Sequence, residues 1–391
     1  MDKRLLVLAF GMFAIGTDGF VMAGVLPQIA HFYDVGIGAA GQVTTAYALS
    51  FALLAPTVAA IAGNVPRKTL MLLGMTVFVA ANLATAVAPT FGVAILMRVI
   101  TGLGAAMFAP TASGVGAMIV APERRGFALS IIIGGLTTAT ALGSPLGSVI
   151  GGVGDWRWTM IFVSALGVLA FLGVLFLLSN LPMLSAVSLA RRLAPLADAR
   201  ILLTLLTTML AMGGNFTVYT YFSVVFDRAI GGNPLLLGIL LVVWGASGTI
   251  GNLVTGRIVD RLGVRKVLLT VMILEAVDMA LFAWTGAVLW TAVLAIAIWG
   301  LFAWSIQAPQ QSRLVSLAPT AAPIVLGLNN SGTYLGVTTA GILGAAGVHT
   351  LGAHHLGAIG VALILLALAT CELATWRITA ANRTKAALAT T

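Results

Sequence analysis

The chain has 391 residues, of which 60% are hydrophobic and only 8% are charged. A soluble domain carries about 25% charged residues, so this composition excludes a globular protein with a water-exposed surface. The formal net charge is +9, and its distribution along the chain decides whether it indicates an acidic partner or a membrane topology.

Apolar stretches of about twenty residues recur from end to end, each long enough to cross a hydrocarbon layer of about 30 Å. The first has no small-residue cleavage site followed by a soluble body, so we expect a retained span and not a signal peptide. We predict an all-α membrane protein with twelve transmembrane helices, at about 5–30, 41–62, 69–88, 91–118, 127–150, 158–180, 201–226, 234–256, 267–286, 288–312, 322–348 and 354–376.

The basic residues lie mostly on one side of these spans. Counted from an inside N-terminus, 17 of the 20 Lys and Arg fall on that side, Arg157 and Arg228 fall on the other, and Arg98 lies within a span. Cytoplasmic segments are enriched in Lys and Arg, so both termini are predicted in the cytoplasm. The positive charge then reflects topology, and we expect no nucleic-acid partner.

Asp18 lies within the first span, inside the apolar run from Leu5 to Ala30. An ionisable group at bilayer depth is costly and typically marks a place where ions or protons move. At 1.5 Å per residue Asp18 lies about 20 Å from the cytoplasmic end, and Arg98 of the fourth span lies at about 19 Å. The pair predicts a proton-coupling site, because desolvation and a nearby cation act oppositely on the carboxyl. A static ion pair needed only for folding is the alternative.

Glu275 and Asp278 of the ninth span are further candidates for the coupling acid, since a spacing of three residues places them on one helix face. Cys371 is the single cysteine and the four histidines lie at loops or span ends, so neither a metal site nor a cofactor is expected. The chain has no phosphate-binding loop of the G-x-x-x-x-G-K-[ST] type and no cluster of catalytic polar groups, which argues against an enzyme or an ATP-driven pump.

The one long connection, 181–200, falls at the midpoint of the chain. It predicts an N-terminal six-helix bundle at 1–180, a cytoplasmic linker at 181–200 and a C-terminal bundle at 201–391. A weak repeat at an offset of 197 residues pairs Asp18 with Asn215 and Gly135 with Gly332. Two pseudo-symmetric halves with a binding site between them are typical of secondary transporters.

The loop after the eighth span matches G-x-x-x-D-R-x-G-x-R-K and resembles the signature loop of the major facilitator superfamily. Its matching residues are Gly256, Asp260, Arg261, Gly263, Arg265 and Lys266. We expect Gly256 to allow a close helix approach, Asp260 to accept charge-assisted hydrogen bonds at a helix end, and the loop to stabilise one conformer. The first-half copy at 63–68 keeps a basic pair but has no Asp.

The fifth span is similar to the antiporter motif G-x-x-x-G-P-x-x-G-G of the same superfamily, through Gly134, Gly143, Pro145 and Gly147. Small residues allow close helix packing and a proline allows a bend, so generic packing is the alternative interpretation. The whole chain resembles the bacterial drug:H+ antiporter branch, which includes chloramphenicol-resistance and sugar-efflux proteins, through 16–20, 24–30 and 155–158. Many members have Glu where this chain has Gly19, one position after Asp18.

In the arrangement that this resemblance implies, neutral polar and aromatic groups line a central cavity, a composition typical of small-molecule sites. The candidate cavity residues are Phe20, Met22, Gln42, Tyr47, Asn215, Tyr219, Gln307, Asn329 and Asn330. The prediction is therefore a monomeric, proton-coupled exporter of small neutral or weakly polar molecules in a bacterial cytoplasmic membrane, surrounded by lipid. A nutrient-importing symporter and a sugar or nucleoside exporter are the alternatives.

Overall fold

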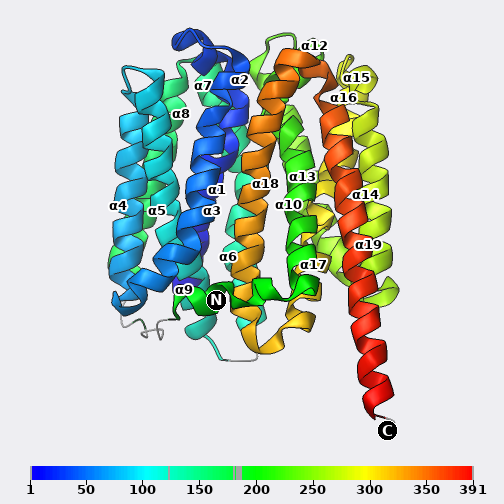
Figure 1. Ribbon diagram of the computed structural model, residues 1–391. Helices are drawn as coiled ribbons and strands as arrows, with labels where there is room; N and C mark the ends of the chain where they lie inside the picture. The colour runs from blue at the N-terminus through cyan, green and yellow to red at the C-terminus, as the bar shows by residue number, and fades with distance from the viewer. Residues whose placement is uncertain (1, 122–123, 179–180, 182–186, 390–391) are drawn as a thin grey trace.

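The computed structural model describes residues 2–121, 124–178, 181 and 187–389, so much of the predicted linker, 182–186, lies outside the described residues. The helices run roughly parallel, and both termini lie at one end of the bundle (Figure 1), here called the terminal end. The first half contains α1 (Lys3–Phe32), α2 (Ile37–Ala40), α3 (Gln42–Ile61), η1 (Ala62–Asn64), α4 (Arg67–Ala86), α5 (Phe91–Met118), α6 (Arg125–Thr138), η3 (Ala139–Gly143), α7 (Ser144–Val153) and α8 (Trp156–Leu177).

Two short elements, α9 (Leu189–Leu193) and η4 (Ala194–Ala197), follow at the terminal end. The second half contains α10 (Ala199–Tyr219), α11 (Phe222–Val225), α12 (Asp227–Ile230), α13 (Pro234–Leu262), α14 (Val264–Ala280), α15 (Phe282–Thr285), α16 (Leu289–Ser305), α17 (Gln307–Leu317), η5 (Pro319–Ala321), α18 (Ala322–Thr350), η6 (Ala353–His355) and α19 (Leu356–Ala389).

Within the described residues each of the twelve predicted stretches is mostly helical, which confirms the all-α membrane architecture. Judged by length and composition alone, ten of the helical segments in the described chain could cross a bilayer. The ninth and eleventh predicted spans fall on α14, which has 17 residues, and on α18, which carries a polar run around Asn329. Packing within the bundle places these two helices beside the other spans (Figure 1).

Three of the long helices begin with the same local signal, an Asp followed two residues later by an Arg. Asp2, Asp155 and Asp198 each accept a hydrogen bond from the backbone N–H of that Arg and pair with its guanidinium. An N-cap carboxylate satisfies an N–H group that the helix leaves free. At the starts of α1 and α10 the Arg hydrogen bonds hold the pKa of the Asp2 and Asp198 carboxyls below their usual range. The two halves therefore open with the same cap.

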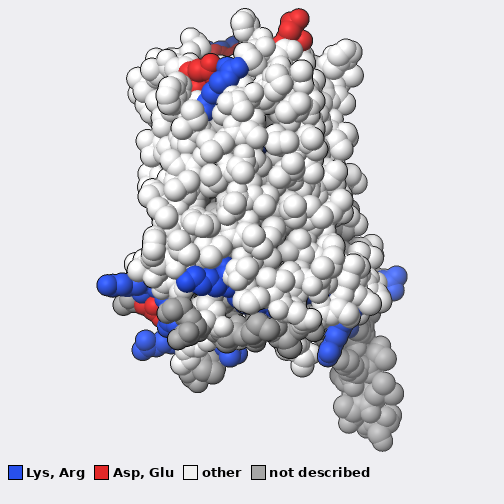
Figure 2. All heavy atoms as spheres, turned by 90° about the vertical axis from the view of Figure 1, so that its left-hand side faces the viewer, with Lys and Arg blue, Asp and Glu red and all other residues white. Residues whose placement is uncertain are grey.

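On the face formed by N-terminal helices, exposed charge gathers at the ends of the bundle (Figure 2). Figure 2 shows, on the face formed by N-terminal helices, Lys and Arg gathered towards the terminal end and a smaller charged group at the opposite end. The broad middle of that face is white, the colour of uncharged residues (Figure 2). Such a band is expected where lipid hydrocarbon covers the protein, because charges there are costly.

The halves meet along two seams. In one, α3 packs against α18; in the other, α7 and η3 pack against α13. The second seam is tight because Gly245 of α13 faces the backbone of Thr140 in η3, where an added Cβ would collide. η3 is a π-helical turn that ends two residues before Pro145, a residue that cannot donate the backbone hydrogen bond of a regular helix.

Candidate functional site

Asp18 of α1 and Arg98 of α5 form an ion pair inside the first half. One guanidinium nitrogen lies 2.8 and 3.0 Å from the two carboxyl oxygens, and both side chains are fully buried. The similar depths estimated from the sequence are consistent with this contact. Removing two charges from water is costly, so such a pair requires further hydrogen bonds around it.

Those further contacts come from α3 and α4. Arg98 donates to the Val43 carbonyl oxygen at 3.3 Å and to Asn82 Oδ1 at 3.3 Å, and its guanidinium lies 4.8 Å from the centre of the Tyr47 ring. Arg98 Nη2 has no hydrogen-bond partner among the described residues. The pair is thus held by four helices and closed to solvent in this conformation.

Sequence reasoning did not identify Asn82, although a signal existed: it is the one amide in the apolar run from 69 to 88. Tyr334 of α18 was also missed. The centre of its ring lies 4.1 Å from that of Phe51, and the ring also lies beside Tyr47. The second half therefore reaches the aromatic side chains around the ion pair.

A cluster of aromatic rings fills the middle of the bundle around Phe20. The rings of Phe216, Tyr219, Trp244 and Trp304 lie 5.7–6.4 Å from it. The Tyr219 hydroxyl lies 3.2 Å from the Phe20 carbonyl oxygen and 3.2 Å from the Ser144 hydroxyl. Phe20 and Tyr219 therefore meet where the two halves join, and Met22 belongs to the same buried cluster.

Two further contacts join the halves away from the terminal end. Gln42 donates to the Gly341 carbonyl oxygen at 3.1 Å. The Tyr221 hydroxyl lies 3.3 Å from the Gly38 carbonyl oxygen of the first half and 3.0 Å from the Gly341 carbonyl oxygen of its own half. Together with the Tyr219 contacts they close this part of the interface. On the terminal side, Arg192 of α9 donates to the Ala59 carbonyl oxygen at 3.1 Å.

The other polar cavity candidates lie mainly between helices of the second half. Asn215 accepts a hydrogen bond from the Trp299 indole at 2.6 Å, and Asn329 accepts one from Thr208 at 2.9 Å. Gln307 lies 3.5 Å from the Thr333 hydroxyl, and Asn330 is exposed. In this conformation Asn215 and Asn329 bond within their own half.

The signature loop joins α13 to α14 at an exposed turn. Gly263 has φ +82°, a backbone conformation that favours glycine, which explains why a glycine separates the helices. Arg265 pairs with Glu372 of α19 at 2.6 Å, while Asp260 has no ion pair among the described residues. The expectation for Gly256 was wrong, since an added Cβ there would meet nothing within 4 Å.

The small residues of the antiporter-type motif differ in their surroundings. Gly143 and Gly147 face Thr17 and Val21 of α1, where a Cβ would collide, as close packing requires. Gly134 faces open space, so the packing explanation was wrong for that position. Its neighbour Gly135 faces the Ala9 backbone of α1 instead. The motif is therefore a contact surface for the helix that carries Asp18.

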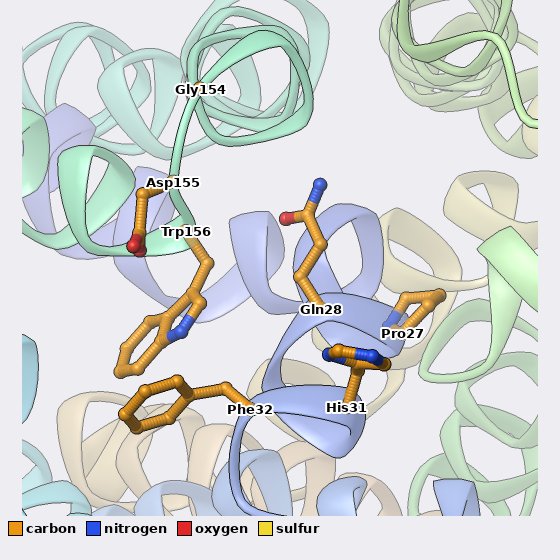
Figure 3. Close-up of a pocket in the computed structure, with 7 residues that line it drawn as sticks. All are labelled: Pro27, Gln28, His31, Phe32, Gly154, Asp155 and Trp156. Atoms are coloured by element: carbon orange, nitrogen blue, oxygen red, sulfur yellow. The ribbon is translucent and has the colours of Figure 1, made fainter.

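A surface pocket of about 460 Å³ lies at the end of the bundle opposite the termini. Figure 3 shows Gln28, His31 and Phe32 of α1 facing Asp155 and Trp156 across it. A second pocket of about 260 Å³ surrounds the Arg265–Glu372 pair. Both lie away from the ion pair of Asp18.

The family model "Major Facilitator Superfamily" matches residues 8–341 and 204–389. The chain belongs to the major facilitator superfamily. This facilitator is 30% identical over 352 residues to the inner membrane transport protein YdhP of Escherichia coli O157:H7, covering 89% of this chain and 90% of that one. It is a membrane transporter and not an enzyme.

Two other relatives of this facilitator carry efflux or resistance names. The chloramphenicol resistance protein of Streptomyces lividans is 32% identical over 268 residues, 67% of this chain and 68% of that one. A probable sugar efflux transporter of Helicobacter pylori (strain J99) is 26% identical, with 88% of each chain covered. The fold matches a bacterial homologue of the human lysosomal transporter Spinster in an inward-facing, unoccupied conformation, with TM-score 0.75 and 16% identity over 95% and 96% of the two chains.

Proposed function

We propose that this transporter is a proton-coupled antiporter that exports small neutral or weakly polar molecules. The observation that carries the proposal is the fully buried Asp18–Arg98 pair on two helices of the bundle. Protonating Asp18 removes one charge from the pair and leaves Arg98 to its neutral neighbours, so proton binding changes the energy of the α1–α5 contact by a large amount.

The coupling step follows from where Asp18 lies on α1. Two residues further along, the Phe20 carbonyl oxygen accepts the Tyr219 hydrogen bond from the other half. A proton that loosens α1 from α5 therefore acts on the same helix that closes the interface. Water must reach Asp18 in another conformation, in which the two six-helix halves have rocked apart and broken the Tyr219 contact.

Export, rather than import, is supported by the fifth span and by the names of relatives. The segment η3–α7 packs its glycines against α1 and α13, and so lies at the interface between the halves. Names of chloramphenicol resistance and sugar efflux among the relatives support drugs or sugars as the substrate class. The neutral, aromatic groups around Phe20 fit such molecules better than ions.

The basic residues support an orientation with both termini in the cytoplasm of a bacterial inner membrane. In that orientation the closed part of the interface faces outward, and α9 lies on the cytoplasmic side. We propose that one chain suffices for transport, with residues 1–180 and 201–391 as the two rocking bodies, and that the loop at 256–266 favours one conformer.

Asp18→Asn tests the coupling assignment. After a panel of drugs, sugars and nucleosides has identified a substrate in a pump-deficient strain, transport is measured in proteoliposomes. Efflux driven by a pH gradient should be lost, because the amide cannot exchange a proton, while exchange of labelled for unlabelled substrate without a gradient should persist. The matched control is Asp34→Asn, at an exposed turn residue with φ 51° that Asn also tolerates. Gradient-driven efflux that survives in Asp18→Asn would show that another group couples transport.

A further inference from the structure

The second half contains a buried carboxyl that the mechanism above does not use. Glu275 of α14 is fully buried, and neither of its carboxyl oxygens has a hydrogen-bond partner within 3.5 Å among the described residues. The side chain of Asn215 of α10 faces its carboxyl group. Asn215 in turn accepts the Trp299 indole hydrogen at 2.6 Å.

The residues around Glu275 occupy the same spans of the second half as the Asp18–Arg98 site occupies in the first half, but the residue types differ from span to span. In the first half, the first, third and fourth spans supply an acid, an amide and a cation: Asp18, Asn82 and Arg98. In the second half, the corresponding spans α10, α14 and α16 supply an amide, an acid and a neutral donor: Asn215, Glu275 and Trp299. The acid and the amide have changed helices, and an indole has replaced the guanidinium.

The replacement of the cation changes the charge that the site tolerates. The Asp18 site is neutral overall when its carboxyl is ionised, because Arg98 lies beside it. The Glu275 site has no cation, so it is neutral only when the carboxyl holds a proton. An isolated ionised carboxylate is very unfavourable in a buried apolar setting, whereas the neutral acid is tolerated there.

Charged groups on the helices packed against α14 do not alter this conclusion. On α19, Glu372 pairs with Arg265, and on α17 Arg313 lies against the Cys371 sulfur at 3.5 Å. The charged residues of α13 (Arg257, Asp260 and Arg261) lie near its C-terminal end, and Arg200 of α10 pairs with Asp198. The titratable group that faces Glu275 is Asp278, one turn further on the same helix and itself an acid.

We propose that Glu275, together with Asn215, is a second proton-binding site, located in the C-terminal half and loaded at neutral pH. The transporter then holds a proton-binding group in each half, and the Glu275 site is occupied when Asp18 is ionised. The site itself is independent of whether Asp18 couples transport; its use in the transport cycle rests on the proposed function.

Infrared difference spectroscopy of the purified full-length protein in lipid nanodiscs tests the site without a known substrate. Between neutral and alkaline pH, the wild type should lose a carbonyl band of a protonated carboxylic acid. Glu275→Gln should remove this band, and Asn215→Leu should shift its frequency while leaving the acid in place. Asp278→Asn, the matched control on the same helix, should leave the Asn215-sensitive band unchanged.

A proton count gives a second readout. Over the same pH step, a pH-indicator dye should register about one more proton released by the wild type than by Glu275→Gln. In the infrared spectrum, Asp18→Asn should keep the band that responds to Asn215→Leu. A spectrum in which no protonated-acid band responds to either Glu275→Gln or Asn215→Leu would overturn the proposal, whatever the outcome of the Asp18 transport assay. Should Glu275→Gln fail to fold, the Asn215→Leu shift alone decides.

Discussion

At the residue scale, the ion pair depends on both partners being present. Removing one member of a buried pair leaves the other charge uncompensated and lowers the free energy of unfolding by about 3–5 kcal/mol. Replacing both members often leaves the stability almost unchanged. We therefore expect Arg98→Gln to lower the free energy of unfolding by about 3–5 kcal/mol near neutral pH. Thermal and denaturant unfolding in detergent micelles would measure this change.

The double variant Asp18→Asn with Arg98→Gln should recover most of the lost stability, because two neutral amides replace the pair. At low pH the single Arg98→Gln variant should lose less stability, since placing a proton on the buried Asp18 carboxyl then costs less free energy. The exposed Asp155–Arg157 pair provides the control: Arg157→Gln should cost at most about 1 kcal/mol. A double variant no more stable than Arg98→Gln would contradict this account of the pair.

At the element scale, two neighbouring glycines of α6 separate packing from helix propensity. Gly135 faces the Ala9 backbone, which cannot move aside as a side chain can, so Gly135→Ala should destabilise by about 1–3 kcal/mol through overpacking. Gly134 faces open space, so Gly134→Ala should be neutral or stabilise by up to about 1 kcal/mol through helix propensity. Unfolding measurements on the two variants compare them directly, and equal effects would show that α6 is not held against α1 in this way.

At the scale of the whole molecule, hydroxyl groups close the interface between the halves. Tyr221→Phe removes a hydroxyl that lies 3.3 Å from the Gly38 carbonyl oxygen across the interface and 3.0 Å from the Gly341 carbonyl oxygen of its own half. A full hydrogen bond contributes about 1 kcal/mol, so the shared hydrogen should change the population by at most roughly fivefold. The conformer that is open at this end should become more populated. Spin labels are attached to cysteines introduced at Val153 and Leu235, both exposed near this end, after the native cysteine is removed by Cys371→Ser. A longer distance between the two labels would report the open conformer.

Tyr33→Phe is the matched control for that experiment, because the Tyr33 hydroxyl donates to the Ala88 carbonyl oxygen within the first half. The control should leave the distance distribution unchanged. If both variants shift it equally, the effect is one of general loosening and not of the interface.

The sequence by itself determined the membrane architecture and the family. Twenty-residue apolar runs, one-sided Lys and Arg and the loop at 256–266 are local patterns, and a bilayer leaves a chain of this kind few alternatives to helices. The depth of Asp18 and Arg98 also followed from helical rise alone. These features need no knowledge of which helix touches which.

Only the tertiary structure decided which side chains meet. Depth along a helix does not give its rotation, so the sequence could not show that Asn82 joins the ion pair, that Asn215 faces Glu275, or that Gly135 rather than Gly134 contacts α1. Rotation is set by packing against neighbours distant in the chain, and residues one position apart on a helix face directions about 100° apart. The local pattern fixes the helices, and contacts between them fix the sites.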